Sequence, residues 1–191
     1  MNKMIISFFL ILFSTTCSVF AGDVVRGNDL SQREFDNILN ESNHMLHKLW
    51  NIIDQIIERD VDVYITPQIS LGAARGMHSI LINPRVFTPN LKNYPEDRLV
   101  VVLLHEYGHI VYNRKLNGRT SNRVDHEYAA FKYSVRQASY IAEDGDVGPI
   151  RQLIHYLPIR IKNGNRSDPH TIALKELTKE RFWLEQLTKY Q

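Results

Sequence analysis

The feature that most constrains the fold is an apolar run inside a segment that also carries ionisable side chains. Residues 99–104 are six consecutive aliphatic residues, and ionisable residues follow them directly. Pro95 marks the start of a helical segment, and Asn117 and Gly118 mark its end. A helix that is apolar around most of its circumference is buried. We therefore expect residues 96–116 to form a central helix that carries polar side chains into the interior.

The remaining elements follow from residue periodicity. Apolar residues recur at helical spacing over residues 31–59, whereas residues 61–66 alternate with period two. Residues 23–29 are expected to be a polar lead-in and residues 71–76 to be turn-prone. The pattern predicts a predominantly helical α+β fold with a small mixed sheet packed against the central helix. The further expected elements are a strand at 78–83 and helices from Asn122 or Asp125 to 143, at 148–157 and at 169–189.

The first 21 residues have the features of a secretory signal peptide. Lys3 precedes an apolar run at residues 4–13, and Val19 and Ala21 are small residues before the expected cleavage site. That run is too short to span a bilayer, and no later stretch reaches about 18 apolar residues. We expect export to the periplasm or out of the cell, with residues 22–191 forming one domain that has no membrane span after cleavage.

Charge and cysteine content narrow the classes of partner. The chain has 23 Lys and Arg against 21 Asp and Glu, and the two signs are interspersed. This balance gives no basic patch for nucleic acid or an anionic membrane surface. The single cysteine, Cys17, lies in the expected signal peptide, so the mature protein must be held together by packing.

The central helix carries the motif on which a functional hypothesis depends. His105, Glu106 and His109 form an H-E-x-x-H pattern. Residues four apart lie on one face of a helix, so both imidazoles can reach one metal ion, with Glu106 beside the water that completes the site. Zinc would lower the pKa of that water, and Glu106 would take its proton as general base. The metzincin pattern is excluded, because its further glycine and histidine correspond to Tyr112 and Lys115.

A catalytic zinc site needs a third protein ligand. Glu127 lies 18 residues after His109, which is enough for a turn and an antiparallel return by the next helix. We expect Glu127 to be this ligand. His126 and Asp125 are the alternatives, and the competing interpretation is that all three are polar residues favoured at a helix start.

These segments resemble a known family. Residues 102–111 fit the extended zincin pattern, and residues 127–130 match the E-x-x-A helix of gluzincin metallopeptidases, including CAAX-protease-like and ImmA-like groups. The resemblance covers roughly residues 73–135 and implies a zincin-like fold, a zinc cofactor and hydrolysis of a peptide or protein substrate. Residues 73–76 followed by 80–82 are similar to the edge strand that binds extended substrate there, so residues 80–83 are expected to pair with substrate.

The sequence also departs from this family. Many gluzincins have an aspartate four residues after the ligand glutamate, where this chain has Phe131. His170 is similar to a His-Pro element of some members, with the order reversed, and is a candidate to stabilise the oxyanion. Tyr128 is a second candidate for an oxyanion or substrate contact. Tyr112 and Tyr133 are further candidates to donate a hydrogen bond to the oxyanion.

Three alternatives to a peptidase stay open at this point. The first is a zinc amidase that acts on a cell-wall peptide, because a fold does not determine a substrate. The second is a catalytically silent module that keeps the zincin fold for binding. The third is a secreted effector or toxin with the same chemistry and a different target.

Overall fold

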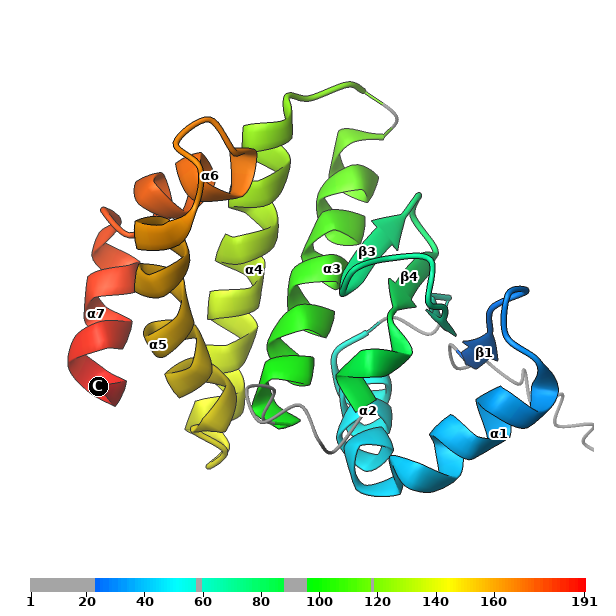
Figure 1. Ribbon diagram of the computed structural model, residues 1–191. Helices are drawn as coiled ribbons and strands as arrows, with labels where there is room; N and C mark the ends of the chain where they lie inside the picture. Colours follow the sequence, from blue (N-terminus) through cyan, green and yellow to red (C-terminus); the bar gives the residue numbers. More distant parts are fainter. Residues whose placement is uncertain (1–22, 58–59, 88–95, 118) are drawn as a thin grey trace, which may run out of the picture.

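The computed structural model describes residues 23–57, 60–87, 96–117 and 119–191. In this part of the chain the fold is mixed α+β and predominantly helical, which confirms the expected class (Figure 1). The expected signal peptide, residues 1–21, lies outside the described residues. The elements are β1 Val24–Arg26, α1 Gln32–Glu41, α2 Asn43–Gln55, β2 Asp62–Ile65, β3 Gly72–Arg75, β4 Ser79–Ile82, a 3-10 helix η1 Pro84–Phe87, α3 Glu96–Leu116, α4 Arg123–Glu143, α5 Gly148–Asn163, α6 Pro169–Leu177 and α7 Arg181–Tyr190.

The strands form a four-stranded mixed sheet in the order β1-β2-β4-β3. β1 and β4 both pair in parallel with β2, and β3 pairs antiparallel with β4 at the edge. Val63, Ile65, Ile80 and Ile82 are fully buried on the inner face of the sheet. Buried and partly exposed residues therefore alternate along β2, as the period-two pattern of its sequence predicts.

Three expectations for this sheet are wrong. Residues 23–29 contain a strand, β1, and the turn-prone segment 71–76 contains the edge strand β3. Residues 80–83 cannot accept a further strand along β4, because both edges of β4 are occupied, by β2 and β3. The chain reverses at Gly76, whose φ of 67° is in the left-handed region that favours glycine, and this turn lays β3 against the outer edge of β4.

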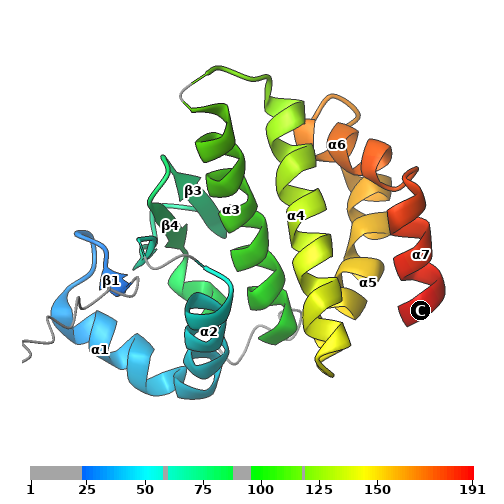
Figure 2. The same ribbon diagram turned by 180° about the vertical axis from the view of Figure 1, so that it is seen from behind.

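The central helix is α3, as the apolar run predicts. It lies between the sheet and α4, and α3 and α4 run antiparallel (Figure 1). Leu99, Leu103, Leu104 and Ile110 have no exposed surface. On the far side of α4, α5, α6 and α7 complete the helical half of the molecule (Figure 2).

The predicted long helix at 31–59 is two helices. The break comes at Ser42, whose backbone (φ −115°, ψ 21°) ends α1 and precedes α2. The Ser42 hydroxyl is buried and donates a hydrogen bond of 2.9 Å to the Phe87 carbonyl oxygen. This long-range contact fixes the bend, although the apolar periodicity continues across it.

The C-terminal helices also differ from their predicted bounds. α5 continues past residue 157 to Asn163 with the exposed Pro158 inside it. The segment 169–189 is divided where Thr178 caps the end of α6 and Glu180 caps the start of α7. α4 begins after Asn122, whose side chain accepts a hydrogen bond from the Asp125 backbone N–H. Among the described helices, none is long and apolar enough to cross a membrane.

Candidate metal centre

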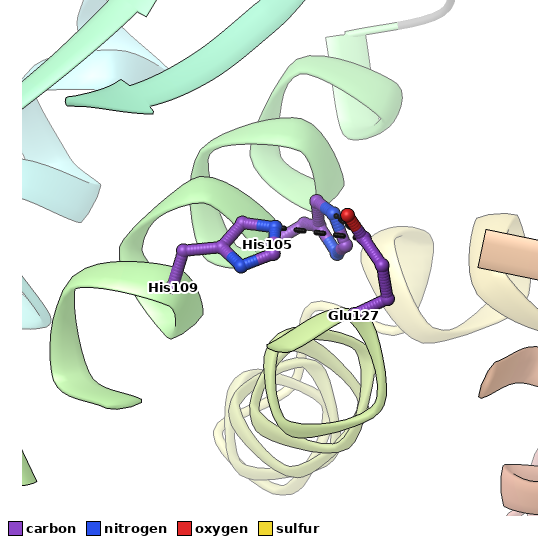
Figure 3. A group of neighbouring side chains, drawn as sticks. All are labelled: His105, His109 and Glu127. Atoms are coloured by element: carbon purple, nitrogen blue, oxygen red, sulfur yellow. Dashed lines mark ion pairs between the residues drawn. The ribbon is translucent and has the colours of Figure 1, made fainter. Parts of the chain in front are cut away.

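Two histidines of α3 and one carboxylate of α4 point toward one another (Figure 3). Glu127 Oε2 lies 3.3 Å from His105 Nε2 and 3.5 Å from His109 Nε2. The three donor atoms all lie within 4.8 Å of one another. Within the described residues, this is the group of histidines and carboxylates that could hold a metal ion.

The close approach of α3 and α4 places these side chains. His105 and His109 are one helical turn apart on α3, and Gly108 lies between them in the sequence. A Cβ atom on Gly108 would lie 2.8 Å from the Cα atom of Ala130 and 2.9 Å from its carbonyl oxygen. Glycine at residue 108 therefore lets the backbone of α4 approach α3, and Glu127 is one turn before Ala130 on α4.

The donor atoms lie in a largely desolvated position. The side chains of His105, His109 and Glu127 are 11%, 15% and 14% exposed. Glu127 Oε2 and His105 Nδ1 are buried without a hydrogen-bond partner, although three imidazole nitrogens lie near Oε2. Burying an ionised carboxylate in this way is unfavourable unless a cation compensates it, so the residues present fit a metal ion.

The charge state of Glu127 suits such a role. Burial alone raises the pKa of this carboxyl group, but the His105 and His109 imidazoles beside it lower the pKa by more. The pKa of Glu127 is therefore held well below its ordinary value. Glu127 is ionised at neutral pH, which is the form that binds a metal.

Glu106 lies next to this group and faces a cleft. It is buried, with 8% of its surface exposed, and it lines a cleft of about 360 Å³ together with His105 and His170. Gly72 of the edge strand β3 packs directly against it, since a Cβ on Gly72 would lie 3.1 Å from Glu106 Cγ and Oε1. The edge strand thus holds the Glu106 side chain in place at the cleft.

His170 enters the site from a different part of the chain. Its Nε2 atom lies 3.2 Å from Glu127 Oε2, and its Nδ1 atom lies 3.3 Å from Asp168 Oδ1. Asp168 is the N-cap of α6 and pairs with Arg160 at 2.8 Å. Burial raises the pKa of Asp168, and the hydrogen bonds to His170 and Thr171 together with the His170 and Arg160 charges bring it below its ordinary value.

The other residues considered from sequence lie elsewhere. Asp125 is exposed and bonded to Asn122 at the start of α4, and the His126 ring packs on Tyr112, 4.9 Å between centroids. Burial and the nearby His109 lower the pKa of His126. Neither residue belongs to the metal-binding group found in the described part of the chain.

Tyr128 does not line the cleft beside His105. It faces a separate hollow of about 550 Å³, which Tyr112 and Tyr133 also line, and its hydroxyl accepts a hydrogen bond of 3.3 Å from Lys132 Nζ. Of the two candidates for an oxyanion or substrate contact, His170 lines the cleft beside His105 and Tyr128 lines the other hollow.

Several residues of the site were not predicted from the sequence. Phe131 packs on His105 with ring centroids 4.2 Å apart, in the place where many gluzincins have an aspartate. Tyr156 and Arg160 line the cleft from α5, and Asp168 holds His170 from α6. The sequence carries one signal for the α5 wall of the cleft. Gln152, Tyr156 and Arg160 are spaced four residues apart, as expected of side chains on one face of a helix.

Comparison with protein-family models, with curated proteins and with solved structures found no match. A group of two imidazoles and one ionised carboxylate, buried beside a cleft with a further carboxylate, can hold a metal ion at the cleft.

Proposed function

We propose that the protein is an exported, zinc-dependent metallopeptidase of the gluzincin type. The observation that carries this proposal is the convergence of His105, His109 and Glu127 on one point, with the buried Glu106 beside them at a cleft. The order of these residues along α3 and α4 is that of the family that the sequence resembles. The features of a signal peptide in residues 1–21 support export, so the substrate would lie in the periplasm or outside the cell.

Zinc is the metal that the chemistry of the ligand set favours. Ligands at about 2.0–2.1 Å around a tetrahedral zinc ion lie about 3.3–3.4 Å from one another. The two separations from Glu127 Oε2, 3.3 Å to His105 and 3.5 Å to His109, are close to that edge length, and all three donor atoms lie within 4.8 Å of one another. Two histidines and one glutamate are also a common ligand set of catalytic zinc, which leaves a fourth position open.

Each residue of the site has a role in hydrolysis of an amide. A zinc ion held by His105, His109 and Glu127 would supply a bound water of lowered pKa and a Lewis acid for the scissile carbonyl group. Glu106 takes one proton from the attacking water and passes it to the leaving nitrogen, so that the peptide bond and one water become a carboxylic acid and an amine. His170 is placed by Asp168 to donate a hydrogen bond to the oxygen on which negative charge develops.

The edge strand β3 suits an extended substrate. Its pairing with β4 uses one edge, and within the described sheet β3 is the last strand on that side. Gly72 brings this strand against Glu106, at the cleft. A peptide added along β3 would therefore lie across the general base, with main-chain hydrogen bonds holding it extended.

The decisive experiment compares metal content and cleavage in matched variants. We expect about one zinc per chain in protein purified without chelator, and chelator-sensitive cleavage of peptides. Glu106→Gln should keep zinc and lose hydrolysis, since it removes the proton acceptor only, whereas His105→Ala should lose both. His47→Ala, a change at an exposed histidine of α2, is the matched control and should alter neither.

Two results would contradict the proposal. Stable protein that carries no metal and binds none excludes a zinc enzyme. Zinc-loaded protein whose function, including partner binding, is unaffected by Glu106→Gln is a catalytically silent binding module. Cleavage of cell-wall peptides but not of polypeptides would instead assign the amidase reaction.

The third ligand needs its own test. Glu127→Ala should weaken zinc binding by more than the roughly 10- to 100-fold that loss of an outer-shell partner costs. His126→Ala is the control of similar position, because its ring packs on Tyr112 outside the metal group. Zinc affinity is measured by competition with a chromogenic chelator. If His126→Ala lowers the affinity and Glu127→Ala does not, the assignment of Glu127 is wrong.

A further inference from the structure

The cleft beside the metal centre is lined by two helical stripes of side chains. α3 contributes Arg98 and Val102 along with His105, and α5 contributes Tyr156 and Arg160. On each helix the spacing is three or four residues, so each set lies on one face. The cleft therefore extends from the metal centre along α3 toward its N-terminus.

Positive charge is concentrated in this cleft. Arg98 and Arg160 both line it, and Glu106 at its metal end is the one acidic residue among the described residues that line it. Arg98 lies over the Tyr156 ring, with its guanidinium carbon 4.9 Å from the ring centroid. The N–H groups of a guanidinium lie in one plane and match a carboxylate, and an aromatic ring beneath the guanidinium attracts its charge.

Arg160 is only partly neutralised by its partner. Asp168 Oδ2 accepts from Arg160 at 2.8 Å, but the same carboxylate also accepts from Thr171 and faces His170. One negative charge is thus shared between a guanidinium and an imidazole. Away from the zinc ligands and Glu106, the described residues that line the cleft include Arg98 and Arg160 and no carboxylate.

The length of the cleft sets where a bound carboxylate would lie. Arg98 precedes His105 by seven residues, which is about 10 Å along a helix axis. An extended peptide covers that distance in about three residues. A negative group that pairs with Arg98 would therefore be about three residues from the bond at the metal centre.

We propose that this cleft selects substrates by a carboxylate, which Arg98 and Arg160 bind, and that the protein cleaves near an acidic side chain or a free C-terminus. This proposal rests on the proposed peptidase function for its cleavage part. The two sources of a carboxylate share the same chemistry, because either presents two oxygens to a guanidinium.

The test uses alanine-rich hexapeptides in which one glutamate is moved through the sequence. Each has a partner with glutamine at the same position, and each is made with a free and with an amidated C-terminus. Affinity is measured by fluorescence anisotropy with the zinc-loaded Glu106→Gln variant, which cannot turn over the peptide. Values of kcat/KM are measured with the unmodified protein on the same set.

We expect a carboxylate to improve affinity and kcat/KM by about 10-fold or more over its amide counterpart, as expected for a charged hydrogen-bonded pair. Arg98→Gln should lower this carboxylate-to-amide ratio toward the remainder that Arg160 supplies, and Arg98→Lys should retain more of the ratio than Arg98→Gln. Arg181→Gln is the matched control, since the Arg181 side chain is 92% exposed on α7. It should leave the ratio unchanged.

The outcomes separate the two proposals. A preference that depends on the position of the glutamate identifies a side-chain carboxylate as the bound group. A preference that disappears on amidation identifies the C-terminal carboxylate. Each of these results supports the carboxylate site. A ratio near one in unmodified protein, or a ratio that Arg98→Gln leaves unchanged, overturns it. Absence of any cleavage contradicts the peptidase function alone, because the anisotropy ratio still decides whether the cleft binds a carboxylate.

Discussion

Gly108→Ala should test whether the contact between α3 and α4 positions the metal ligands. The added Cβ would lie 2.8 Å from Ala130 Cα and 2.9 Å from the Ala130 carbonyl oxygen. Ordinary carbon contacts are about 3.5–4.0 Å, so α4 must move away by about 1 Å. Backbone atoms cannot rotate out of the way as a side chain would. Glu127 lies one turn from Ala130 on α4 and should move with it.

Two opposing effects determine stability, whereas one effect dominates metal binding. Overpacking costs about 1–3 kcal/mol, but alanine is favoured over glycine within a helix by about 1 kcal/mol. The net loss of unfolding free energy is therefore about 0–2 kcal/mol, which lowers Tm by up to about 8 °C in a domain of this size. A displacement of about 1 Å, however, is half of a zinc–oxygen bond length, so zinc affinity should fall by at least about 10-fold.

The assay is chelator competition for zinc affinity, combined with thermal unfolding of the metal-free protein. Gly76→Ala is the control, because Gly76 has a φ of 67° and a Cβ atom added to it would meet no other atom within 4 Å. That variant should lose stability through backbone strain and keep its zinc affinity. Gly108→Ser should lower both the zinc affinity and the Tm by more than Gly108→Ala, because its side chain is larger. A Gly108→Ala protein with a raised Tm and unchanged zinc affinity would refute the reasoning, since alanine would then have been accommodated without moving α4.

Two further predictions concern stability. Ser42→Ala leaves the Phe87 carbonyl oxygen without its buried donor and should cost about 1–3 kcal/mol in urea unfolding; unchanged stability would show that the α1–α2 bend does not need this bond. Asp168→Asn keeps an oxygen that can cap α6 but removes the charge facing Arg160 and His170. The pKa of Asp168 is lowered from 3.8 in the folded state, so the ionised carboxylate stabilises the fold at pH values above 3.8. This stabilisation is lost as the pH falls through the pKa of the folded state. The variant should be less stable at pH 7 by under about 1 kcal/mol, and a difference that persists well below pH 3.8 would contradict this assignment.

Local periodicity was sufficient to predict the central helix and the face of it that carries His105 and His109. The apolar residues from Leu99 to Leu104 require burial on all sides, and the four-residue step from His105 to His109 places both rings together. The third ligand of the proposed metal site was left open by the sequence, because the distance along the chain from His109 allows Asp125, His126 or Glu127. Only the rotation of α4 about its axis, set by its packing on Gly108, distinguishes them.

The features that were not predicted depend on contacts between distant segments. Strand order is one, because nothing within β3 or β4 indicates which of them lies at the edge. The bend at Ser42 is another, since it depends on a carbonyl group 45 residues away. The cleft is a third, because Arg98 and Arg160 come from helices that are far apart in the sequence.

The origin of the ligands on two separate helices has a mechanical consequence. An ion held by His109 and Glu127 closes a loop of 18 residues and so ties α3 to α4 as a disulfide would. A disulfide acts by restricting the unfolded chain, whereas an ion bound only by the folded arrangement would stabilise that arrangement by mass action. Residues 22–191 contain no cysteine, so this region has no disulfide of its own to supply such a tie. Loading and removing the ion would then switch a cross-link on and off at the centre of the molecule.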